Sequence, residues 1–500
     1  MPQIKKILVA NRGEIALRIM RTAREMNIAT VAIFSEADRK SPHVRYADEA
    51  ICIGPAPSTE SYLNMAKILQ VCKDLNVDAI HPGYGFLSEN AIFARKVQEA
   101  GLIFIGPSPE AIEIMGSKLA AKQAASRYNI PMVPGTAEAI EDRQEAKELA
   151  GVIGYPILIK ASAGGGGKGM RVVSNEAEFD EQMDRAVSEA LSSFGDGSVF
   201  IEKYISSPKH IEIQVLGDHH GNIIHLFERE CSIQRRHQKV VEEAPSISIT
   251  SEIRKEMGRC AVDVARSCGY YGAGTVEFIM DEDHRFYFLE MNTRLQVEHP
   301  VTEQITGIDL VKQMILIAEG NTMKIQQEDL AIKGHSIEVR VYAEDSANNF
   351  LPDVGTLHTY VKPDGNGVRV DDGFEQGMEI PIYYDPMIAK LITYGQNREE
   401  AIAKMIRAID EYQISGVQTT LPFCRFVMNH EEFTSGRFDT NFVARHFDPE
   451  ILKSHSNEDA IQLAAIISGI LTKNKKENEL TQNELSAEIF SKWKSRRLRV

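Results

Sequence analysis

Between Glu290 and Glu298, every second residue carries a polar group that could do chemistry. These alternating positions would share one side of a β-strand, because successive side chains of a strand point to opposite faces. Two oxygen ligands suited to a metal ion come first, followed by a cation, an amide and a carboxylate suited to a small oxyanion. A solvated edge strand shows the same alternation, so the pattern leaves both interpretations open. The residues are Glu290, Asn292, Arg294, Gln296 and Glu298.

A second carboxylate, Glu277, is expected opposite Glu290. Gly274–Met280 and Arg285–Asn292 have the composition of two strands, with turn-forming residues between them. A hairpin loop over residues 282–285 would place the Cβ atoms of the two glutamates ~5 Å apart. Opposed like charges are destabilising, and a divalent cation such as Mg²⁺ would turn this repulsion into ligation. The pattern is equally compatible with a different strand register, in which the two glutamates lie on a solvated face without facing each other.

A glycine cluster at Gly164–Gly169 leaves few side chains to obstruct a ligand. Its backbone N–H groups could approach a polyphosphate closely, and Lys168 adds positive charge. It is not a Walker A loop, because Lys168 is followed by glycine rather than by Ser or Thr. Strand-like residues 156–160 and 170–173 flank the cluster, which favours a lid between paired strands over a flexible linker.

Two lysines near this loop are the natural phosphate ligands, although a lone lysine is normally a solvated surface residue. Lys160 ends an apolar strand-like run, and Lys118 precedes that run in the chain. Further on, Phe200–Ile205 places a polar pair inside an apolar strand. Adenine needs an apolar slot with backbone hydrogen bonds at its edge, which this segment suits. These features together predict a nucleotide site.

The elements that would position these residues form an α/β block followed by α+β blocks. Residues 1–115 alternate strand-like and helix-like runs, which predicts a Rossmann-like, open and largely parallel sheet. Its first turn, Asn11-Arg12-Gly13-Glu14, lacks G-x-G-x-x-G, so no dinucleotide site is expected. Residues 115–330 and 335–446 follow as mixed blocks, with a helix over Glu399–Tyr412. The main expected strands are Ile7–Ala10, Thr30–Phe34, Ala50–Ile53, Val77–His81, Leu102–Gly106, Pro156–Lys160, Val199–Ile201, Ile211–Leu216, Ile223–Phe227, Ile337–Tyr342, Gly355–Val361 and Ile388–Tyr394.

The composition is that of a soluble globular protein, with 43% hydrophobic and 25% charged residues. Its 71 acidic residues exceed 56 basic ones, and the net charge of −15 argues against nucleic-acid binding through a general positive field. The six cysteines form no C-x-x-C pair, which favours a reducing compartment. No signal peptide and no membrane span of ~18 apolar residues is recognised, so a cytoplasmic protein is expected.

Three longer stretches resemble biotin carboxylases of the ATP-grasp superfamily. They are His81–Asn90, Glu228–Pro245 and Glu290–Pro300, and the likeness extends over residues 3–445. Ala163 and Lys168 depart from the glycine and arginine usual in that family's lid. The resemblance implies an N-terminal biotin carboxylase domain (1–114), an ATP-grasp domain (115–330) with a glycine-rich lid at about 131–203, a C-terminal biotin carboxylase domain (331–446) and a helical tail (447–500).

The resemblance also implies a role for each matching position. Glu277 and Glu290 match both ATP-binding and metal-binding positions. The bicarbonate pocket would use the backbone of Val297. Arg340 would bind biotin, and Glu298, Arg294, Lys239 and Arg340 would be the catalytic residues. The ATP ligands are Lys118, Lys160, Gly166, Gly167, Glu202, Lys203, Tyr204, Ile205, His210, Gln234, His237, Glu277 and Glu290; the Mg²⁺ (or Mn²⁺) ligands are Glu277, Glu290 and Asn292; the bicarbonate ligands are Lys239, Arg294, Gln296, Val297 and Glu298.

The activity implied is ATP- and bicarbonate-dependent carboxylation of biotin through carboxyphosphate, the first half-reaction of an acyl-CoA or pyruvate carboxylase. Glu298 would act as the base for bicarbonate, and Arg340 would stabilise the biotin enolate. The chain contains no Met-Lys-Met, the biotin attachment sequence, so biotin is expected on a separate carrier protein. A carboxyltransferase partner and a homodimer are further expectations from the family. Another ATP-grasp carboxylate or carbamoyl ligase, or an inactive nucleotide-binding subunit, is the alternative.

Beyond His446 the resemblance fades. Asp459–Leu471 has the pattern of an amphipathic or largely buried helix, and a second helix-like segment spans Leu485–Trp493 before a basic end. Packing on the third domain and docking to a partner subunit are both compatible with this pattern.

Overall fold

The computed structural model describes residues 3–136, 140, 142–161, 170–453 and 466–469, and of Lys118, Leu119 and Phe194 only the backbone. The chain divides into two compact units. The first comprises Met1–Ser346 and Phe350–His446, and the second comprises Ala347–Asn349 and Phe447–Val500. Every strand in the described residues belongs to the first unit.

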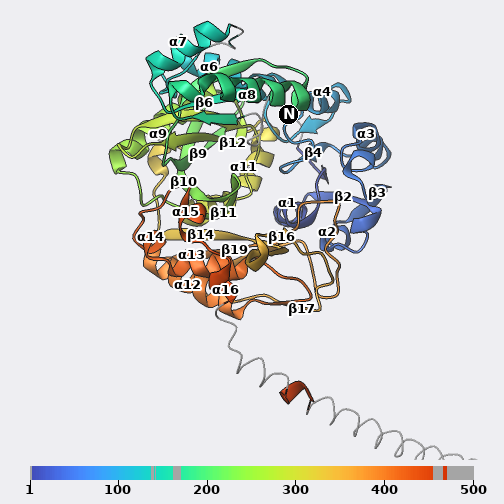
Figure 1. Cartoon of the computed structure of the whole chain (residues 1–500). Helices are drawn as coiled ribbons and strands as arrows, with labels where there is room; N and C mark the ends of the chain where they lie inside the picture. Colours follow the sequence, from blue (N-terminus) through green and yellow to red (C-terminus); the bar gives the residue numbers. More distant parts are fainter. Residues whose placement is uncertain (1–2, 137–139, 141, 162–169, 454–465, 470–500) are drawn as a thin grey trace, which may run out of the picture. The chain divides into compact units, whose positions relative to one another are not determined.

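The N-terminal part is a five-stranded parallel sheet in the order β3-β2-β1-β4-β5, as expected (Figure 1). Its strands alternate between two cores: Ile7 and Val9 face one hydrophobic cluster, while Leu8 faces the other. Both faces are therefore buried, as in other parallel sheets. The elements are β1 (Lys6–Val9), α1 (Gly13–Glu25), β2 (Ala29–Ser35), α2 (Pro42–Tyr46), β3 (Glu49–Gly54), α3 (Met65–Asp74), β4 (Ala79–His81), α4 (Ala91–Glu99), β5 (Ile103–Phe104) and α5 (Pro109–Gly116).

A small antiparallel sheet in the order β7-β6-β8 follows, and it flanks the glycine cluster. Its apolar face packs on α7 and α8 around one cluster that includes Ile157, Ile159 and Ile201. The expected lid does join paired strands, since β6 and β7 are neighbours; its residues 162–169 lie outside the described residues. The elements are α6 (Lys118–Ser126), α7 (Arg143–Ile153), β6 (Ile157–Ala161), β7 (Met170–Val173), α8 (Phe179–Phe194) and β8 (Val199–Lys203).

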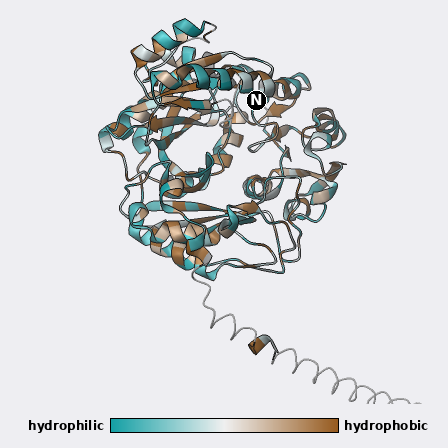
Figure 2. Ribbon diagram, in the orientation of Figure 1, coloured by the Kyte–Doolittle hydropathy of each residue, from teal (hydrophilic) through white to brown (hydrophobic). Residues whose placement is uncertain are grey.

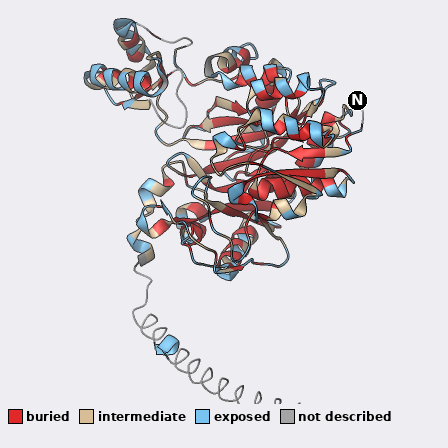
Figure 3. Ribbon diagram, turned by 90° about the vertical axis from the view of Figure 1, so that its right-hand side faces the viewer, coloured by how far each residue is buried: buried red, intermediate tan, exposed pale blue. Residues whose placement is uncertain are grey.

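The largest element is an eight-stranded sheet in the order β13-β12-β9-β10-β11-β14-β19-β18. It is continuous from the central block into the third block because β11 pairs with β14. Its strands are largely apolar and buried, with exposed residues concentrated on the surrounding helices (Figures 2 and 3). The strands are β9 (Lys209–Gly217), β10 (Ile223–Arg235), β11 (Gln238–Ala244), β12 (Gly272–Met280), β13 (Phe286–Asn292), β14 (His335–Tyr342), β18 (Val368–Asp372) and β19 (Met387–Gly395).

Helices cover this sheet, and several expected strands are shorter than predicted, among them β4, which keeps three residues of Val77–His81. Only Thr359–Val361 of the strand expected at Gly355–Val361 is extended, as β17 paired with β20 (Gln413–Ser415). β5 keeps two residues of Leu102–Gly106, and the strand expected to reach Glu298 ends at Asn292. The remaining named elements are α9 (Ser251–Ser267), α10 (His299–Thr306), α11 (Leu310–Ala318), β15 (Glu344–Asp345), β16 (Leu351–Pro352), α12 (Arg398–Glu411), α13 (Leu421–Asn429), α14 (Glu431–Thr434) and α15 (Phe442–His446).

The second unit contains α16 (Glu450–Lys453) and a helical turn at residues 466–469. In that turn Ile466 and Ile467 are 59% and 48% exposed. The remainder of the helix expected at Asp459–Leu471, and all of the segment expected at Leu485–Trp493, lie outside the described residues. No helix in the described part of the chain is long and apolar enough to span a membrane.

Candidate active site

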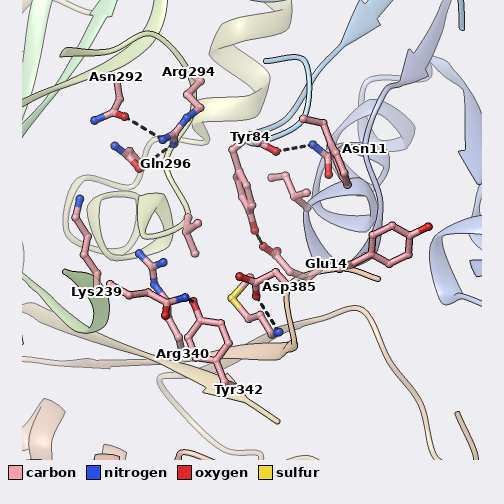
Figure 4. Close-up of a pocket in the computed structure, with 18 of the residues that line it drawn as sticks. Asn11, Glu14, Tyr84, Lys239, Asn292, Arg294, Gln296, Arg340, Tyr342 and Asp385 are labelled. Carbon is pink, nitrogen blue, oxygen red and sulfur yellow. Dashed lines mark hydrogen bonds between the residues drawn. The ribbon is translucent and has the colours of Figure 1, made fainter. Parts of the chain in front are cut away.

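A cavity of about 720 Å³ opens where the three blocks of the first unit meet. Residues from the α1 turn form one wall, and residues from β9 to β14 form the other (Figure 4). Eleven of the expected site residues line it: His210, Gln234, His237, Lys239, Glu277, Glu290, Asn292, Arg294, Gln296, Val297 and Arg340.

The hairpin β12–β13 places Glu277 directly opposite Glu290, as predicted. The loop is one residue longer than expected, because the last pair is Met280 with Phe286. A β-bulge between Glu277 and Phe278 restores the register, and bulges commonly re-aim a side chain beside an active site. The predicted juxtaposition is therefore confirmed, although the turn geometry behind it differs.

The residues expected to hold Mg²⁺ form an all-oxygen donor set. Glu277 and Glu290 face each other, and Asn292 follows on the same strand side as Glu290. One oxygen of Glu277 accepts from Asn292 Nδ2 at 2.9 Å, and the other lies 3.1 Å from His210 Nε2. Paired carboxylates and an amide suit a hard divalent cation, so these residues fit the expected group.

Lys239 lies at the centre of a buried charge cluster, which we define as Lys239, Arg340, Arg229, Glu212, Glu242, Glu277 and Glu298. Its Nζ contacts Glu212 at 2.5 Å, Glu277 at 2.8 Å and Glu298 at 2.8 Å. Burial opposes its charge, but these three carboxylates outweigh burial and hold the pKa of Lys239 well above its usual value. Lys239 is therefore a fixed positive charge at the pocket.

Glu298 is fully buried between two cations. Its second oxygen accepts from Arg340 Nη2 at 3.0 Å, while Arg340 Nε donates to Glu242 at 2.7 Å. Burial favours the protonated acid, yet Lys239 and Arg340 lower the pKa of Glu298 well below its usual value. The carboxylate is thus ionised at neutral pH, as a proton acceptor must be.

The segment after β13 brings its side chains together without being a strand. Glu298 is the N-cap residue of α10, which has Pro300 in its first turn, so the chain turns into a helix here. Arg294 donates to Asn292 at 2.9 Å and to Gln296 at 3.0 Å, and all three line the pocket (Figure 4). Of the five alternating residues, Glu290, Asn292, Arg294 and Gln296 line the cavity, whereas Glu298 is fully buried, and the strand expected to carry them all ends at Asn292. Val297, expected on the opposite side, also lines the cavity.

Glu89 is a site residue that the sequence reasoning missed. It accepts from Arg294 Nε at 2.8 Å and from the Thr293 amide at 3.1 Å. It therefore anchors the 293–298 segment to the N-terminal block. Its position within His81–Asn90, one of the three stretches that resemble the family, could have indicated that Glu89 belongs to the site.

A second cluster of expected ATP ligands surrounds Glu202 on β8. Lys160 Nζ donates to Glu202 at 2.5 Å, and Lys122, which the sequence reasoning also missed, pairs with the other oxygen. Burial raises the pKa of Glu202, but Lys160 and Lys122 outweigh it and lower the pKa below its usual value. Lys203 Nζ donates to the carbonyls of Gly154 and Tyr155.

The remaining expected ATP ligands lie either next to Glu202 or along the main cavity. Tyr204 and Ile205 continue β8 and are half-buried, whereas His210, Gln234 and His237 line the main cavity. His237 has φ of +66°, in a two-residue turn between β10 and β11 that also sets Arg236 at positive φ. Such turns suit the twist of a hairpin but strain non-glycine residues. The Lys118 side chain, Gly166 and Gly167 lie outside the described residues.

Models of known families match nearly the whole first unit. "Biotin carboxylase, N-terminal domain" matches residues 3–112, "Carbamoyl-phosphate synthase L chain, ATP binding domain" matches residues 117–326, and "Biotin carboxylase C-terminal domain" matches residues 338–445.

The chain belongs to the biotin carboxylase family.

Known biotin-dependent carboxylases are similar in sequence along most of the chain. Biotin carboxylase 1 of Bacillus subtilis is 53% identical over 441 residues, covering 88% of this chain and 98% of that protein. Methylcrotonoyl-CoA carboxylase subunit alpha of Rattus norvegicus is 48% identical over 502 residues, covering 99% and 70%. The biotin carboxylase domain dimer of Hydrogenobacter thermophilus 2-oxoglutarate carboxylase, solved with MgADP and bicarbonate, has a TM-score of 0.85 and 48% identity, covering 90% and 99%.

The expected family, fold class and activity are therefore confirmed. This biotin carboxylase is an ATP-grasp ligase that carboxylates biotin at the expense of ATP, and the family uses Mg²⁺. The N- and C-terminal domain matches exclude the alternative of another ATP-grasp carboxylate or carbamoyl ligase.

Proposed function

We propose that the cavity activates bicarbonate, joins it to the γ-phosphate of ATP as carboxyphosphate, and transfers the resulting CO₂ to biotin beside Arg340. The main support for this proposal is the position of Glu298, a buried carboxylate between Lys239 and Arg340. A buried carboxylate beside a cation is suited to deprotonating a small anion, because the cation, here Lys239, holds the substrate while the carboxylate takes its proton.

The first step is proton transfer from bicarbonate to Glu298. The cations that keep Glu298 ionised also make it a weak base. Bicarbonate bound by Arg294 and Lys239 would draw Lys239 away from Glu298, which raises the basicity of the carboxylate when it is needed. Gln296 and the backbone of Val297 complete the proposed anion pocket.

In the second step, a carbonate oxygen attacks the γ-phosphorus of ATP and ADP departs. Lys160, with Lys118, would hold the phosphates through point charges, and Lys203, Tyr204 and Ile205 would bind adenine. Glu202, His210, Gln234 and His237 complete the proposed nucleotide site, to which the family resemblance adds Gly166 and Gly167. Mg²⁺ held by Glu277, Glu290 and Asn292 would offset the negative charge of the phosphates.

In the third step, carboxyphosphate releases CO₂ and phosphate beside biotin. The freed phosphate accepts the ureido N–H proton, and CO₂ forms the new N–C bond. Arg340 would stabilise the negative charge that develops on the ureido oxygen. The guanidinium already reaches the cavity, where it lies between Glu242 and Glu298.

Replacing Arg340 tests this assignment directly. Arg340→Ala should retain slow bicarbonate-dependent ADP release and lose carboxylation of free biotin, because only the last step needs the guanidinium. The two rates are measured on the same purified protein, with ADP release coupled to a dehydrogenase and carboxybiotin trapped from labelled bicarbonate. Equal loss of both rates would place Arg340 in bicarbonate activation instead.

We further propose that biotin arrives on a biotin carboxyl carrier protein and that a carboxyltransferase subunit accepts the product. The relatives are components of biotin-dependent carboxylases, and one solved relative is a domain dimer, which supports a homodimer here. The rat methylcrotonoyl-CoA relative aligns over 99% of this chain, including the tail, whereas the Bacillus relative aligns over 88%. That difference favours an acyl-CoA acceptor. Reconstitution with the co-purifying carboxyltransferase and a panel of acyl-CoA esters and pyruvate tests it.

We also propose a reducing, cytoplasmic setting with neither nucleic acid nor membrane as a partner. All six cysteines are free thiols, and four of them are buried. A net charge of −15 supports the exclusion of nucleic acid.

A further inference from the structure

Lys390, in the middle of β19, has a side chain that solvent does not reach. Its Nζ donates to the backbone carbonyl of Val297 at 2.9 Å and lies 3.3 Å from Glu14 Oε2. Asp371 is more distant, at 3.9 Å, and already accepts two hydrogen bonds from Arg369. A buried ammonium is costly unless it is paired, so the Val297 carbonyl and Glu14 determine where this side chain points.

Lys390 is the direct cross-strand partner of Arg340. The two residues are paired in the antiparallel ladder between β14 and β19, so their side chains lie on the same face of the sheet. Arg340 reaches Glu298, and Lys390 reaches the carbonyl of the preceding residue, Val297. Two neighbouring cations therefore hold two consecutive residues of the segment that carries the proposed bicarbonate ligands.

The second contact of Lys390 leads to the opposite wall of the cavity. Glu14 accepts a hydrogen bond from the Tyr84 hydroxyl, and both residues line the cavity (Figure 4). The third block approaches α1 very closely here: a Cβ on Gly373 would lie 2.7 Å from the Glu14 amide nitrogen. Lys390 thus joins the N-terminal wall to the 293–298 segment.

We propose that Lys390 is a positioning residue for bicarbonate, which rests on the proposed function of the cavity. It holds the Val297 backbone so that Gln296 and Glu298, on either side, face the same anion. It does not touch the substrate; it acts through Val297. Its contact with Glu14 sets the distance between this anion pocket and the Tyr84 wall.

The test separates bicarbonate binding from ATP binding. Lys390→Met keeps the length of the side chain and removes the charge and the hydrogen bond. We expect the KM for bicarbonate to rise about tenfold or more while the KM for ATP changes less than about twofold, because misplacement of a positioned group acts only on the ligand it serves. Lys404→Met is the matched control: Lys404 also bonds a carbonyl, that of Tyr394, and a glutamate, Glu400, but away from the cavity.

Folding of each variant is checked by thermal unfolding. A folded Lys390→Met with an unchanged bicarbonate KM, or with bicarbonate and ATP KM values raised together, would overturn the proposal. If Lys390→Met does not fold, Glu14→Gln decides in assays at about pH 8, above the Glu14 pKa of about 7. It keeps the shape beside Tyr84 and removes the anion beside Lys390: a selective rise in the bicarbonate KM supports the proposal, and no rise refutes it. Bicarbonate-dependent ADP release by the wild-type chain tests the proposed function separately.

Discussion

Glu298 combines two properties that oppose each other in an isolated carboxylate. It is completely buried, and it is kept ionised by Lys239 and Arg340 at 2.8 and 3.0 Å. Burial alone would protonate it, whereas the paired cations alone would make it a poor base. The proposed mechanism needs Lys239 to be shared with the substrate, so that the basicity of Glu298 rises only when bicarbonate is bound.

Glu298→Gln should bind ATP normally and lose biotin carboxylation. Glutamine keeps the shape and removes the proton acceptor, and loss of a general base typically costs ~10²–10⁴-fold in rate. Nucleotide binding is measured by calorimetry, and carboxylation by trapping labelled carboxybiotin. Retention of more than about a tenth of the rate would assign the proton transfer to another group or to water.

Glu14 makes stability depend on pH near neutrality. Burial raises its pKa from the ordinary value of 4.5 to about 7, with Lys390 acting in the opposite direction. Between these values the folded protein holds a proton that the unfolded chain has released. The contribution of Glu14 to stability is therefore complete below pH 4.5 and is lost as the pH rises through about 7.

Glu14→Gln should become more stable relative to wild type as the pH rises from about 5 to about 8, because glutamine cannot ionise. The difference has an upper bound on the order of 3 kcal/mol, from the size of the pKa shift. Melting temperatures of both proteins across this range measure it, with Glu25→Gln, at the exposed end of the same helix, as control. A constant difference would show that Glu14 does not titrate there.

At the scale of elements, the hairpin β12–β13 positions the proposed metal ligands through one irregularity. A regular ladder from the Met280–Phe286 pair would place Glu277 opposite Leu289. Glu290 would then point to the other face of the sheet, and the two glutamates could not share an ion. The bulge beside Phe278 shifts the pairing by one residue and brings Glu290 into place.

Glu290→Gln should raise the Mg²⁺ concentration needed for half-maximal activity by about tenfold or more, because one charged ligand is lost from a hard-cation site. Titration of activity with MgCl₂ at saturating ATP measures the change, after removal of divalent ions with a chelator. Glu282→Gln, in the exposed turn of the same hairpin, is the control. An unchanged Mg²⁺ requirement would exclude Glu290 as a ligand.

At the scale of the whole molecule, one sheet joins the central and third blocks. The β11–β14 pair places Lys239 and Arg340 on neighbouring strands, so the residues proposed for bicarbonate activation and for biotin binding lie on one sheet. None of the proposed site residues comes from the second unit. The catalytic and tail parts of the chain should therefore be separable.

Deletion of residues 456–500 should leave carboxylation of free biotin intact and abolish co-elution with the carboxyltransferase subunit. The expected amphipathic pattern and the exposed Ile466 and Ile467 favour a docking element. Size-exclusion chromatography of the reconstituted complex measures assembly. A narrower variant, Ile466→Asp with Ile467→Asp, should act like the deletion, with Ser468→Asp as control. Intact assembly in both variants would leave the tail a role in local packing only.

Features that depend on neighbours along the chain could be predicted from the order of the amino acids. Apolar periodicity located most strands, the turn residues predicted the β12–β13 hairpin, and the alternation from Glu290 to Glu298 selected four residues that line the cavity. These signals are local, because a strand or turn is encoded within a few consecutive residues. The long motifs added the family, which the comparisons confirm.

Only the tertiary structure decided which distant charges meet. Lys239 with Glu298, Arg294 with Glu89, and Lys390 with Glu14 are separated by up to several hundred positions, and no periodicity relates them. The end of the strand at Asn292 was likewise set by the turn into α10 and by the contact of Thr293 with Glu89. Burial then gave these charges their effect, because in a low-dielectric interior each one determines the ionisation of its neighbours.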